Sequence, residues 1–271
     1  AGYQVAPAVF EELGARVIRR GTRPDGLNIN VDCGSTCPAG LQHAVLEAGA
    51  DAGIALDGDG DRLIMVDEQG HTLDGDQLLW VIARSRQRAG RLSGPVVGTQ
   101  MSNLGLELAL DGLGVAFHRA RVGDRYVLEM LQAHHGQLGG ESSGHIVCLD
   151  RTTTGDGVVS ALQVLAAAVE QNASLSQVAD GMDKLPQHMI NVPIARGSNP
   201  MTDPRVTAAV RDVEGVLGSA GRVLLRPSGT EPLLRVMVDG EDAGSVRAHA
   251  EALASQVAGL CQPQARASSG D

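Results

Sequence analysis

Short apolar blocks alternate along the chain with longer stretches in which apolar residues recur every three or four positions. The stretches at 38–48 and 158–170 have helical spacing, whereas the blocks at 27–31 and 52–56 have the length and pattern of strands. Strands that take turns with helices are typical of layered α/β domains. We therefore expect an α/β architecture over residues 1–183.

Polar residues mark the starts of two predicted helices. Asp74 and Asp76 precede a helix that runs to about residue 88, and Asn103 precedes one that runs to about residue 112. Aspartate and asparagine side chains accept hydrogen bonds from the first backbone N–H groups of a helix. For the Asp74–Asp76 pair, this interpretation is favoured over a second metal site.

After residue 187 the order of the predicted elements changes. A strand, a helix, two strands and a closing helix follow at 189–194, 203–213, 222–226, 233–238 and 242–260. Two strands joined by a short loop suit a small α+β domain. The predicted divisions are the C-terminal part of an α/β domain at 1–72, a second α/β domain at 73–183, an α+β domain at 187–261 and a disordered tail at 262–271.

Three aspartates lie between two apolar blocks, at 52–56 and 63–66. Asp57, Asp59 and Asp61 alternate with glycine, so in an extended backbone their side chains point the same way. Three carboxylates this close repel one another unless a cation neutralises them. Oxygen ligands suit a hard cation such as Mg²⁺ or Ca²⁺. The sequence therefore predicts a metal loop between two strands.

The aspartate loop has two other interpretations. The loop could be an ordinary solvated turn, although the apolar strands on both sides argue against it. It could also be an EF-hand that starts at Asp57, and Glu68 would then supply the twelfth position. The sixth position of that motif needs glycine for a sharp turn and is Arg62 here, and the flanks are strand-like, so we reject the EF-hand.

Composition excludes several classes of function. The formal net charge is −10 and aromatic residues make up 2% of the chain, which argues against binding nucleic acid through its phosphates or by base stacking. No apolar run approaches the length that spans a membrane, and no secretory signal is visible. The four cysteines complete no zinc site. We expect free thiols, a cytoplasmic location, and neither nucleic acid nor membrane as a partner.

A second polar cluster lies in a glycine-framed loop at 139–145. Glu141, Ser142, Ser143 and His145 place a carboxylate, two hydroxyls and an imidazole within five residues. This mixture of donors and acceptors suits the hydroxyl groups of a sugar, and His145 is also a candidate proton carrier. An ordinary polar turn is an equal alternative.

A third cluster lies between the last two predicted strands. It contains Arg226, Ser228, Gly229, Thr230 and Arg235. Backbone N–H groups in such a turn can surround an anion, and the two guanidinium groups can each bind phosphate oxygens in pairs. The spacing differs from that of a nucleotide-binding P-loop. Together, the three loops predict one composite cleft for a sugar phosphate, with a metal that neutralises the transferring phosphoryl group.

The three clusters carry a resemblance to a known family. The motifs 57–62 (DGDGDR), 140–145 (GESSGH) and 226–232 (RPSGTEP) occur in the order found in the α-D-phosphohexomutase family, which the chain resembles over about residues 1–260. Within the family, the stretches 98–106, 122–127 and 226–238 favour the members that act on a hexosamine.

The resemblance implies phosphohexomutase-type α/β domains followed by a small C-terminal α+β domain. It implies an enzyme that interconverts glucosamine 6-phosphate and glucosamine 1-phosphate through a hexosamine 1,6-bisphosphate, for amino-sugar nucleotides and cell-wall precursors. Similar enzymes acting on mannose or glucose phosphates are the alternative. The small-molecule partner would be a sugar phosphate, and a homodimer is left open.

The resemblance also assigns roles to residues of this chain. Mg²⁺ would be held by Asp57, Asp59 and Asp61. Sugar contacts would come from Glu141, Ser143 and His145, and phosphate contacts from Arg226, Ser228, Gly229, Thr230 and Arg235. The candidates for proton transfer or its support are His145, Arg125 and Arg62.

One expected motif is missing. The family's phosphoserine loop, of the type T-A-S-H-N-P, has no counterpart; Ser102-Asn103 comes nearest, but it lacks the histidine and begins a helix. We therefore expect a fragment without the N-terminal phosphoserine domain and without turnover of its own. A non-catalytic sugar-phosphate-binding or metal-binding module is the alternative from another class.

Overall fold

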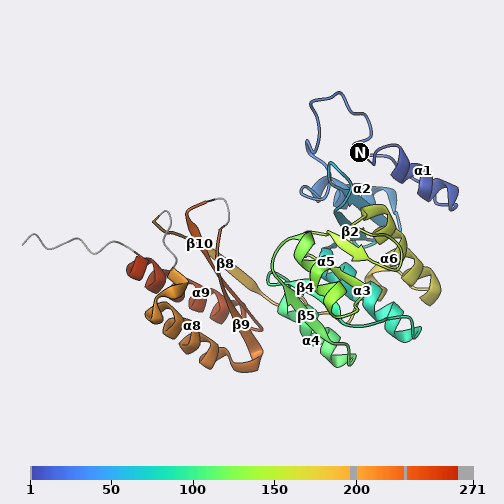
Figure 1. Ribbon diagram of the computed structural model, residues 1–271. Coiled ribbons are helices and arrows are strands. Elements are labelled where there is room, and N and C mark those ends of the chain that lie inside the picture. Colours follow the sequence, from blue (N-terminus) through green and yellow to red (C-terminus); the bar gives the residue numbers. More distant parts are fainter. Residues whose placement is uncertain (1, 196–199, 229–230, 262–271) are drawn as a thin grey trace, which may run out of the picture. The chain divides into compact units, whose positions relative to one another are not determined.

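The computed structural model describes residues 2–195, 200–228 and 231–261, which form two compact units (Figure 1). The first unit is Ala1–Asp183 and the second is Lys184–Asp271. The predicted division at residue 72 falls inside the first unit, and the domain bounds stay a prediction. The tail predicted at 262–271 lies outside the described residues.

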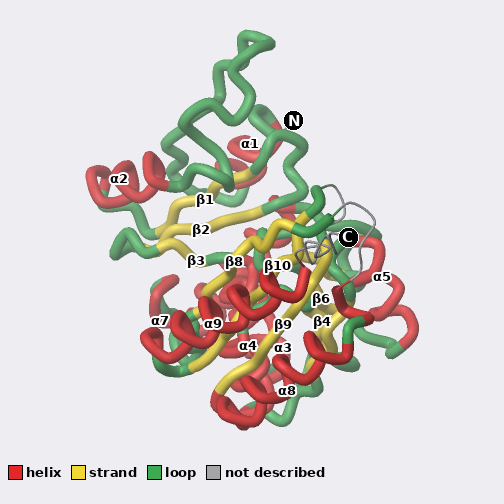
Figure 2. The backbone as a smooth tube through the Cα atoms, turned by 90° about the vertical axis from the view of Figure 1, so that its left-hand side faces the viewer, coloured by secondary structure: helices red, strands yellow, loops and turns green. Residues whose placement is uncertain are grey.

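The first unit begins with a small antiparallel sheet. Its helices are α1 (Val5–Glu12) and α2 (Ala39–Ala48), and its strands are β1 (Ala52–Leu56), β2 (Leu63–Asp67) and β3 (Thr72–Leu73). The strand order is β1-β2-β3, and the three lie side by side in Figure 2. Leu56 pairs with Leu63 at the end of the first hairpin, so the aspartate loop closes this hairpin.

The second sheet of this unit is mostly parallel. Its strands are β4 (Val96–Thr99), β5 (Phe117–Ala120), β6 (Leu138–Gly140) and β7 (Ile146–Cys148). Strand β4 lies between β5 and β6 and is parallel to both, and β7 is antiparallel to β6. The carboxyl ends of β4, β5 and β6 therefore share one edge, where ligands bind in open α/β sheets.

Helices cover both faces of this second sheet. They are α3 (Gly75–Arg88), α4 (Leu104–Gly112), α5 (Asp124–Ala133), α6 (Gly157–Gln171) and α7 (Leu175–Ala179). Val97 packs with Val127 and Leu131 of α5, whereas its neighbour Val96 belongs to the core with α3, α4 and α6. That larger core also contains Leu63 of β2, which joins the two sheets in one unit. None of the helices among the described residues has the length and apolar character needed to cross a bilayer.

The predicted helix caps are confirmed. Asp74 accepts hydrogen bonds from the backbone N–H groups of Asp76 and Gln77, and its own N–H donates to Gln77 Oε1. Asn103 caps α4 through a 2.9 Å bond from Gly105 N. Asp76 is buried and accepts a 2.8 Å bond from Asn103 N. The second aspartate pair therefore builds helix starts and ties α3 to α4.

The strand expected at 27–31 is wrong, and strand β6 was not predicted from the sequence. Residues 27–31 form turns, and Leu27 is 90% exposed; alternation alone supplies no partner strand, and a strand is stable only when paired. Gly139 and Gly140 of β6 are typical of a turn, which is why the sequence did not indicate a strand there. A Cβ at Gly139 would lie 2.7 Å from Val97 O, and one at Gly140 would lie 2.5 Å from His145 O. These glycines allow close approach of backbones within a sheet.

The second unit has the predicted α+β organisation. Its elements are β8 (Gln187–Pro193), the 3₁₀ helices Pro200–Thr202 and Gly218–Ala220, α8 (Pro204–Leu217), β9 (Gly221–Pro227), β10 (Leu233–Gly240) and α9 (Ala243–Cys261). Strand β10 is central and antiparallel to β8 and β9. Leu234 and Val236 of β10 share a core with Val206 of α8 and Ala250 of α9. The other face of β10 carries Arg235.

A carboxylate ties the turn between β2 and β3 to helix α7. Glu68 Oε1 accepts a 2.5 Å bond from Ser176 Oγ, and Glu68 Oε2 accepts a 3.2 Å bond from Ser176 N. Partial burial acts to raise the pKa of Glu68, but the hydrogen bonds from Ser176 and Ser174 outweigh it and lower this pKa to about 2. The ionised carboxylate therefore stabilises the fold above its ordinary pKa of 4.5, and this contribution is lost as pH falls toward 2.

Replacing Glu68 tests this tether. We expect Glu68→Gln to lower the free energy of unfolding of the first unit by about 1 kcal/mol at pH 7, and by less near about pH 3.5. Urea titration followed through Trp80, the chain's single, buried tryptophan, reports on this unit. Glu47→Gln, at a side chain 80% exposed and 3.6 Å from Arg20, is the control and should have no effect. An equal loss at both pH values would contradict the role of the charge.

Candidate functional site

The aspartate loop folds around its first carboxylate. Asp57 Oδ1 accepts hydrogen bonds of 3.2 Å from Gly60 N and 3.1 Å from Arg62 N. Arg62 Nε also lies 3.7 Å from Asp57 Oδ2. Gly60 has a φ of +82°, a left-handed conformation that glycine adopts without steric cost. These contacts turn the chain between the two strands of the hairpin.

The three aspartates converge as the sequence predicts. Asp57, Asp59 and Asp61 each place a carboxylate oxygen so that these atoms all lie within 4.8 Å of one another. Burial, and next the charge of Asp57, raise the pKa of Asp61, while His145 opposes this rise. Asp61 Oδ1 is buried and has no hydrogen-bond partner among the described residues. This crowding of acceptors fits a hard divalent cation, which would supply the missing positive charge.

The rejected EF-hand has no support in the geometry. Glu68, which would be its last ligand, directs both carboxylate oxygens at Ser176. The loop is also flanked by β1 and β2. The aspartate cluster is therefore a strand-to-strand turn.

The glycine-framed loop at 141–145 lies against the aspartate loop. Leu63 N donates a 3.0 Å bond to Gly144 O, and His145 Nε2 lies 3.5 Å from Asp61 Oδ2. Gly144 has a φ of +98°, and a Cβ there would lie 2.1 Å from Leu63 O. The structure thus brings two of the three predicted clusters together within the first unit.

His145 is held in a buried position between the two loops. It is 4% exposed, and its Nδ1 has no hydrogen-bond partner in the described part of the chain. A Cβ at Gly155 would lie 2.2 Å from His145 Nε2. Gly157 N also donates a 2.9 Å bond to Gly60 O. Residues 155–157, at the start of α6, were not assigned to the site from the sequence, and they pack against both loops.

The loop after β5 also reaches the site. Gly123 N donates a 3.0 Å bond to Glu141 Oε1. The loops that carry these two residues follow β5 and β6, whose carboxyl ends lie at the same edge of the sheet on either side of β4. Ser143 is exposed on the same loop as Glu141. Arg125 lies on α5, where its Nε donates a 2.7 Å bond to Glu129. The sequence signal for residues 122–126 is weak, because their contact with Glu141 is made by the backbone N–H of Gly123 and not by a side chain.

The phosphate-loop candidates lie in the second unit. Arg226 on β9 and Arg235 on β10 are directly opposite each other, and like charges in such a cross-strand pair are destabilising. Arg235 Nε is buried and has no hydrogen-bond partner among the residues described. Ser228 N donates to Leu233 O, and Ser228 Oγ accepts a 3.3 Å bond from Glu231 N. An anion would relieve the repulsion between the two arginines.

Two of the predicted residues cannot be placed. Gly229 and Thr230 lie outside the described residues. The composite cleft that would unite this loop with the loops of the first unit stays a prediction.

Sequence profiles of one family cover most of the chain. The profile "Phosphoglucomutase/phosphomannomutase, alpha/beta/alpha domain II" matches residues 1–70, domain III matches 74–185 and the C-terminal domain matches 189–256. A protein named phosphoglucosamine mutase from Alkalilimnicola ehrlichii is 64% identical over 257 residues, which are 95% of this chain and 57% of that protein. One of the same name from Nitrosococcus oceani is 58% identical over 258 residues, again 95% and 57%.

Solved structures share the fold at low sequence identity. A phosphoglucomutase/phosphomannomutase family protein from Burkholderia thailandensis has a TM-score of 0.78 and 20% identity, covering 97% of this chain and 59% of that one. An N-acetylglucosamine-phosphate mutase in its product complex has a TM-score of 0.72 and 18% identity, covering 94% and 59%. The Aspergillus fumigatus N-acetylphosphoglucosamine mutase, in complex with GlcNAc-6P and magnesium, has a TM-score of 0.68 and 19% identity, covering 87% and 58%.

These matches confirm the predicted family. The chain spans less than three fifths of the length of the curated relatives described here. Three successive family domains account for nearly all of it, in the order in which the three polar clusters occur. The chain belongs to the phosphoglucomutase/phosphomannomutase family, the α-D-phosphohexomutases.

Proposed function

We propose that this chain carries the metal-binding and substrate-binding part of a phosphoglucosamine mutase. Such an enzyme interconverts glucosamine 6-phosphate and glucosamine 1-phosphate through a hexosamine 1,6-bisphosphate. The observation that carries the proposal is the contact between the two loops of the first unit, where His145 lies 3.5 Å from Asp61. The 64% identity to a protein of that name supports the choice of hexosamine.

The aspartates are proposed as the metal ligands. Asp57, Asp59 and Asp61 would hold Mg²⁺ through one oxygen each, consistent with their convergence. Bound there, Mg²⁺ supplies positive charge to the oxygens of a transferring phosphoryl group. The magnesium in the Aspergillus relative supports the choice of ion.

Residues around the aspartates are proposed to orient the sugar. Gly123 N occupies Glu141 Oε1, which leaves Glu141 Oε2 to accept a bond from a sugar hydroxyl. Ser143 is exposed next to it and can donate. His145 is the proposed proton carrier, since its imidazole is packed between the loops and beside Asp61. Arg62 would support the loop through Asp57.

Arg226 and Arg235 are proposed to bind the phosphate that is not being transferred. Their side-by-side placement on β9 and β10 presents two guanidinium forks to one anion. Ser228, Gly229 and Thr230 would add hydroxyl and backbone donors. The proposal includes a cytoplasmic location and no nucleic acid or membrane partner, as the charge and composition indicate.

The metal assignment is tested by removing one charge from the loop. We expect Asp59→Asn to weaken Mg²⁺ binding at least about tenfold, since even changes behind the ligands cost 10–100-fold in metal affinity. Isothermal titration of the 271-residue chain measures this affinity. Asp51→Asn, an exposed aspartate just before β1, is the matched control and should bind normally. Equal affinity of Asp59→Asn and the unaltered chain would remove Asp59 from the ligand set.

The phosphate assignment is tested in the second unit. We expect Arg226→Ala to weaken glucosamine 6-phosphate binding about tenfold or more, because a charge-assisted hydrogen bond contributes about 1.5–3 kcal/mol. Mg²⁺ affinity should not change. Arg205→Ala is the control, since Arg205 is 61% exposed and paired with Asp203 in the same unit. A parallel loss in both variants would indicate a general effect of charge.

Turnover tests the proposed activity itself. With Mg²⁺, a hexose 1,6-bisphosphate and glucosamine 6-phosphate, we expect no glucosamine 1-phosphate from the 271-residue chain. A chimera that adds the part of the Alkalilimnicola ehrlichii relative left out of the match should turn over, and prefer glucosamine 6-phosphate to mannose 6-phosphate. Turnover by the chain alone would place the phosphoryl carrier within these residues. A chimera that folds, binds Mg²⁺ and stays inactive would favour a non-catalytic module.

A further inference from the structure

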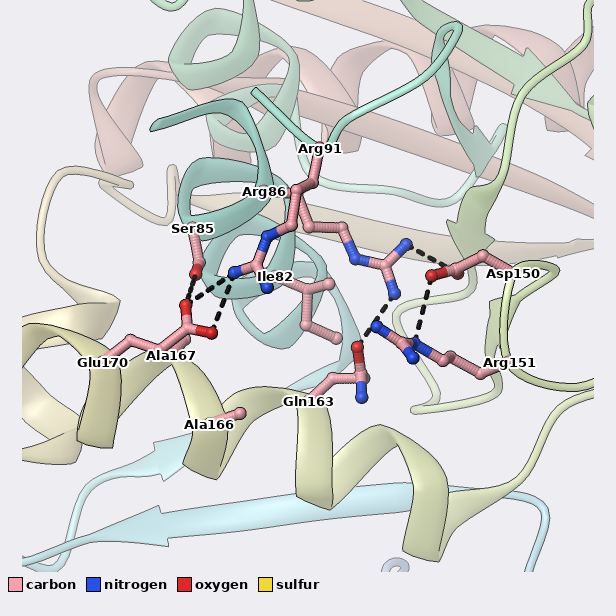
Figure 3. A pocket seen from close by; sticks show the side chains of 10 residues that line it. All are labelled: Ile82, Ser85, Arg86, Arg91, Asp150, Arg151, Gln163, Ala166, Ala167 and Glu170. Carbon is pink, nitrogen blue, oxygen red and sulfur yellow. Dashed lines mark hydrogen bonds and ion pairs between the residues drawn. The ribbon is translucent and has the colours of Figure 1, made fainter. Parts of the chain in front are cut away.

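A cavity outside the proposed site lies between α3, α6 and the loop after β7 (Figure 3). Its volume is about 160 Å³, whereas a single water needs roughly 10–15 Å³ of such space. Ile82 and Ala167 give it an apolar floor, and arginines and carboxylates stand around that floor. The cavity therefore has room for a small molecule with a charged group.

One of its arginines is buried. The Arg86 side chain is 8% exposed, with Nη1 3.0 Å from Asp150 Oδ1 and Nη2 3.0 Å from Gln163 Oε1. A buried charge is tolerated only where it is paired and hydrogen-bonded. Cys148 offers it no negative charge, because burial raises the pKa of this thiol to about 11. Arg86 thus depends on Asp150 for its counter-ion.

Asp150 is shared with a second arginine. Arg151 Nε lies 3.1 Å from Asp150 Oδ2. At the other end of the cavity, Arg91 is satisfied by Glu170, with contacts of 2.9 and 2.7 Å. Three guanidinium groups therefore face two carboxylates, and the excess positive charge lies at the end where Arg86 and Arg151 share one partner.

The same end has spare hydrogen-bond donors. A guanidinium group carries five N–H bonds, and Arg151 uses its Nε on Asp150 while its side chain is 53% exposed. No described residue accepts a bond from the Nη groups of Arg151. Guanidinium forks match the oxygens of phosphate in pairs. Positive charge and N–H donors are therefore both in excess beside Asp150, where Arg86 and Arg151 meet.

We propose that this cavity is a second phosphate-binding site, which takes inorganic phosphate or a small phosphate monoester between Arg86 and Arg151. The body of a monoester would lie over Ile82 and Ala167, toward Glu170. The site shares no residue with the loops of the proposed function. The rival explanation is an ion-pair network that only ties α3 and α6 to the loop after β7.

The test uses the full chain with Arg226→Ala, so that the phosphate loop of the second unit contributes little. Inorganic phosphate and glycerol 3-phosphate are titrated separately by calorimetry at constant ionic strength, and the thermal midpoint is followed through Trp80 on α3. We expect saturable binding with a dissociation constant in the millimolar range or below, and a higher midpoint with ligand. Tighter binding of glycerol 3-phosphate would assign the site to a monoester, and equal binding would assign it to free phosphate.

Two further variants on this background decide whether the cavity is the site. Arg151→Gln should weaken the binding about tenfold. The Arg151 side chain is 53% exposed, so this substitution should leave the fold intact, which circular dichroism checks. Arg19→Gln is the control, because Arg19 is 48% exposed and makes a two-contact pair with Glu11 in the same unit. Absence of saturable binding, or equal effects of the two substitutions, would overturn the proposal and leave the ion-pair network.

Discussion

The proposed site depends on the close approach of two backbones. The bond from Leu63 N to Gly144 O holds the 141–145 loop against the aspartate hairpin. The approach is too close for side chains, since a Cβ at Gly144 or at Gly155 would overlap Leu63 or His145. Because of this packing, the imidazole of His145, in the loop between β6 and β7, comes within 3.5 Å of the Asp61 carboxylate in the loop between β1 and β2. Gly144 and Gly155 therefore shape the site because they have no side chain, which lets His145 lie next to Asp61.

In both units, the residues proposed to bind ligands place like charges close together. The aspartates of the first unit crowd three negative charges, and the opposed pair Arg226–Arg235 of the second unit places two positive charges side by side. Each arrangement costs free energy unless an ion of opposite charge is present. The fold tolerates this because both clusters are attached to well-packed strands, whose cores supply the stability. Binding of an ion of opposite charge would then relieve the repulsion within each cluster, which favours binding.

Local patterns were sufficient for much of the fold. The cap at Asp74, the start of α4 at Asn103 and the strand Ala52–Leu56 were predicted because their signals lie within a few neighbouring residues. The clustering of the three aspartates was predictable for the same reason. What could not be predicted is non-local: the pairing that 27–31 lacks, the contact of Glu68 with Ser176, and the approach of Gly155 to His145.

Strand β7 connects His145 of the proposed site to Asp150 of the cavity. It contains three residues, all at most 1% exposed. His145 comes immediately before it and Asp150 two residues after it, so this one buried strand separates the imidazole beside Asp61 from the carboxylate beside Arg86. Because β7 is buried and paired with β6, a shift of the backbone at one of these residues has little surrounding space to be absorbed before it reaches the other.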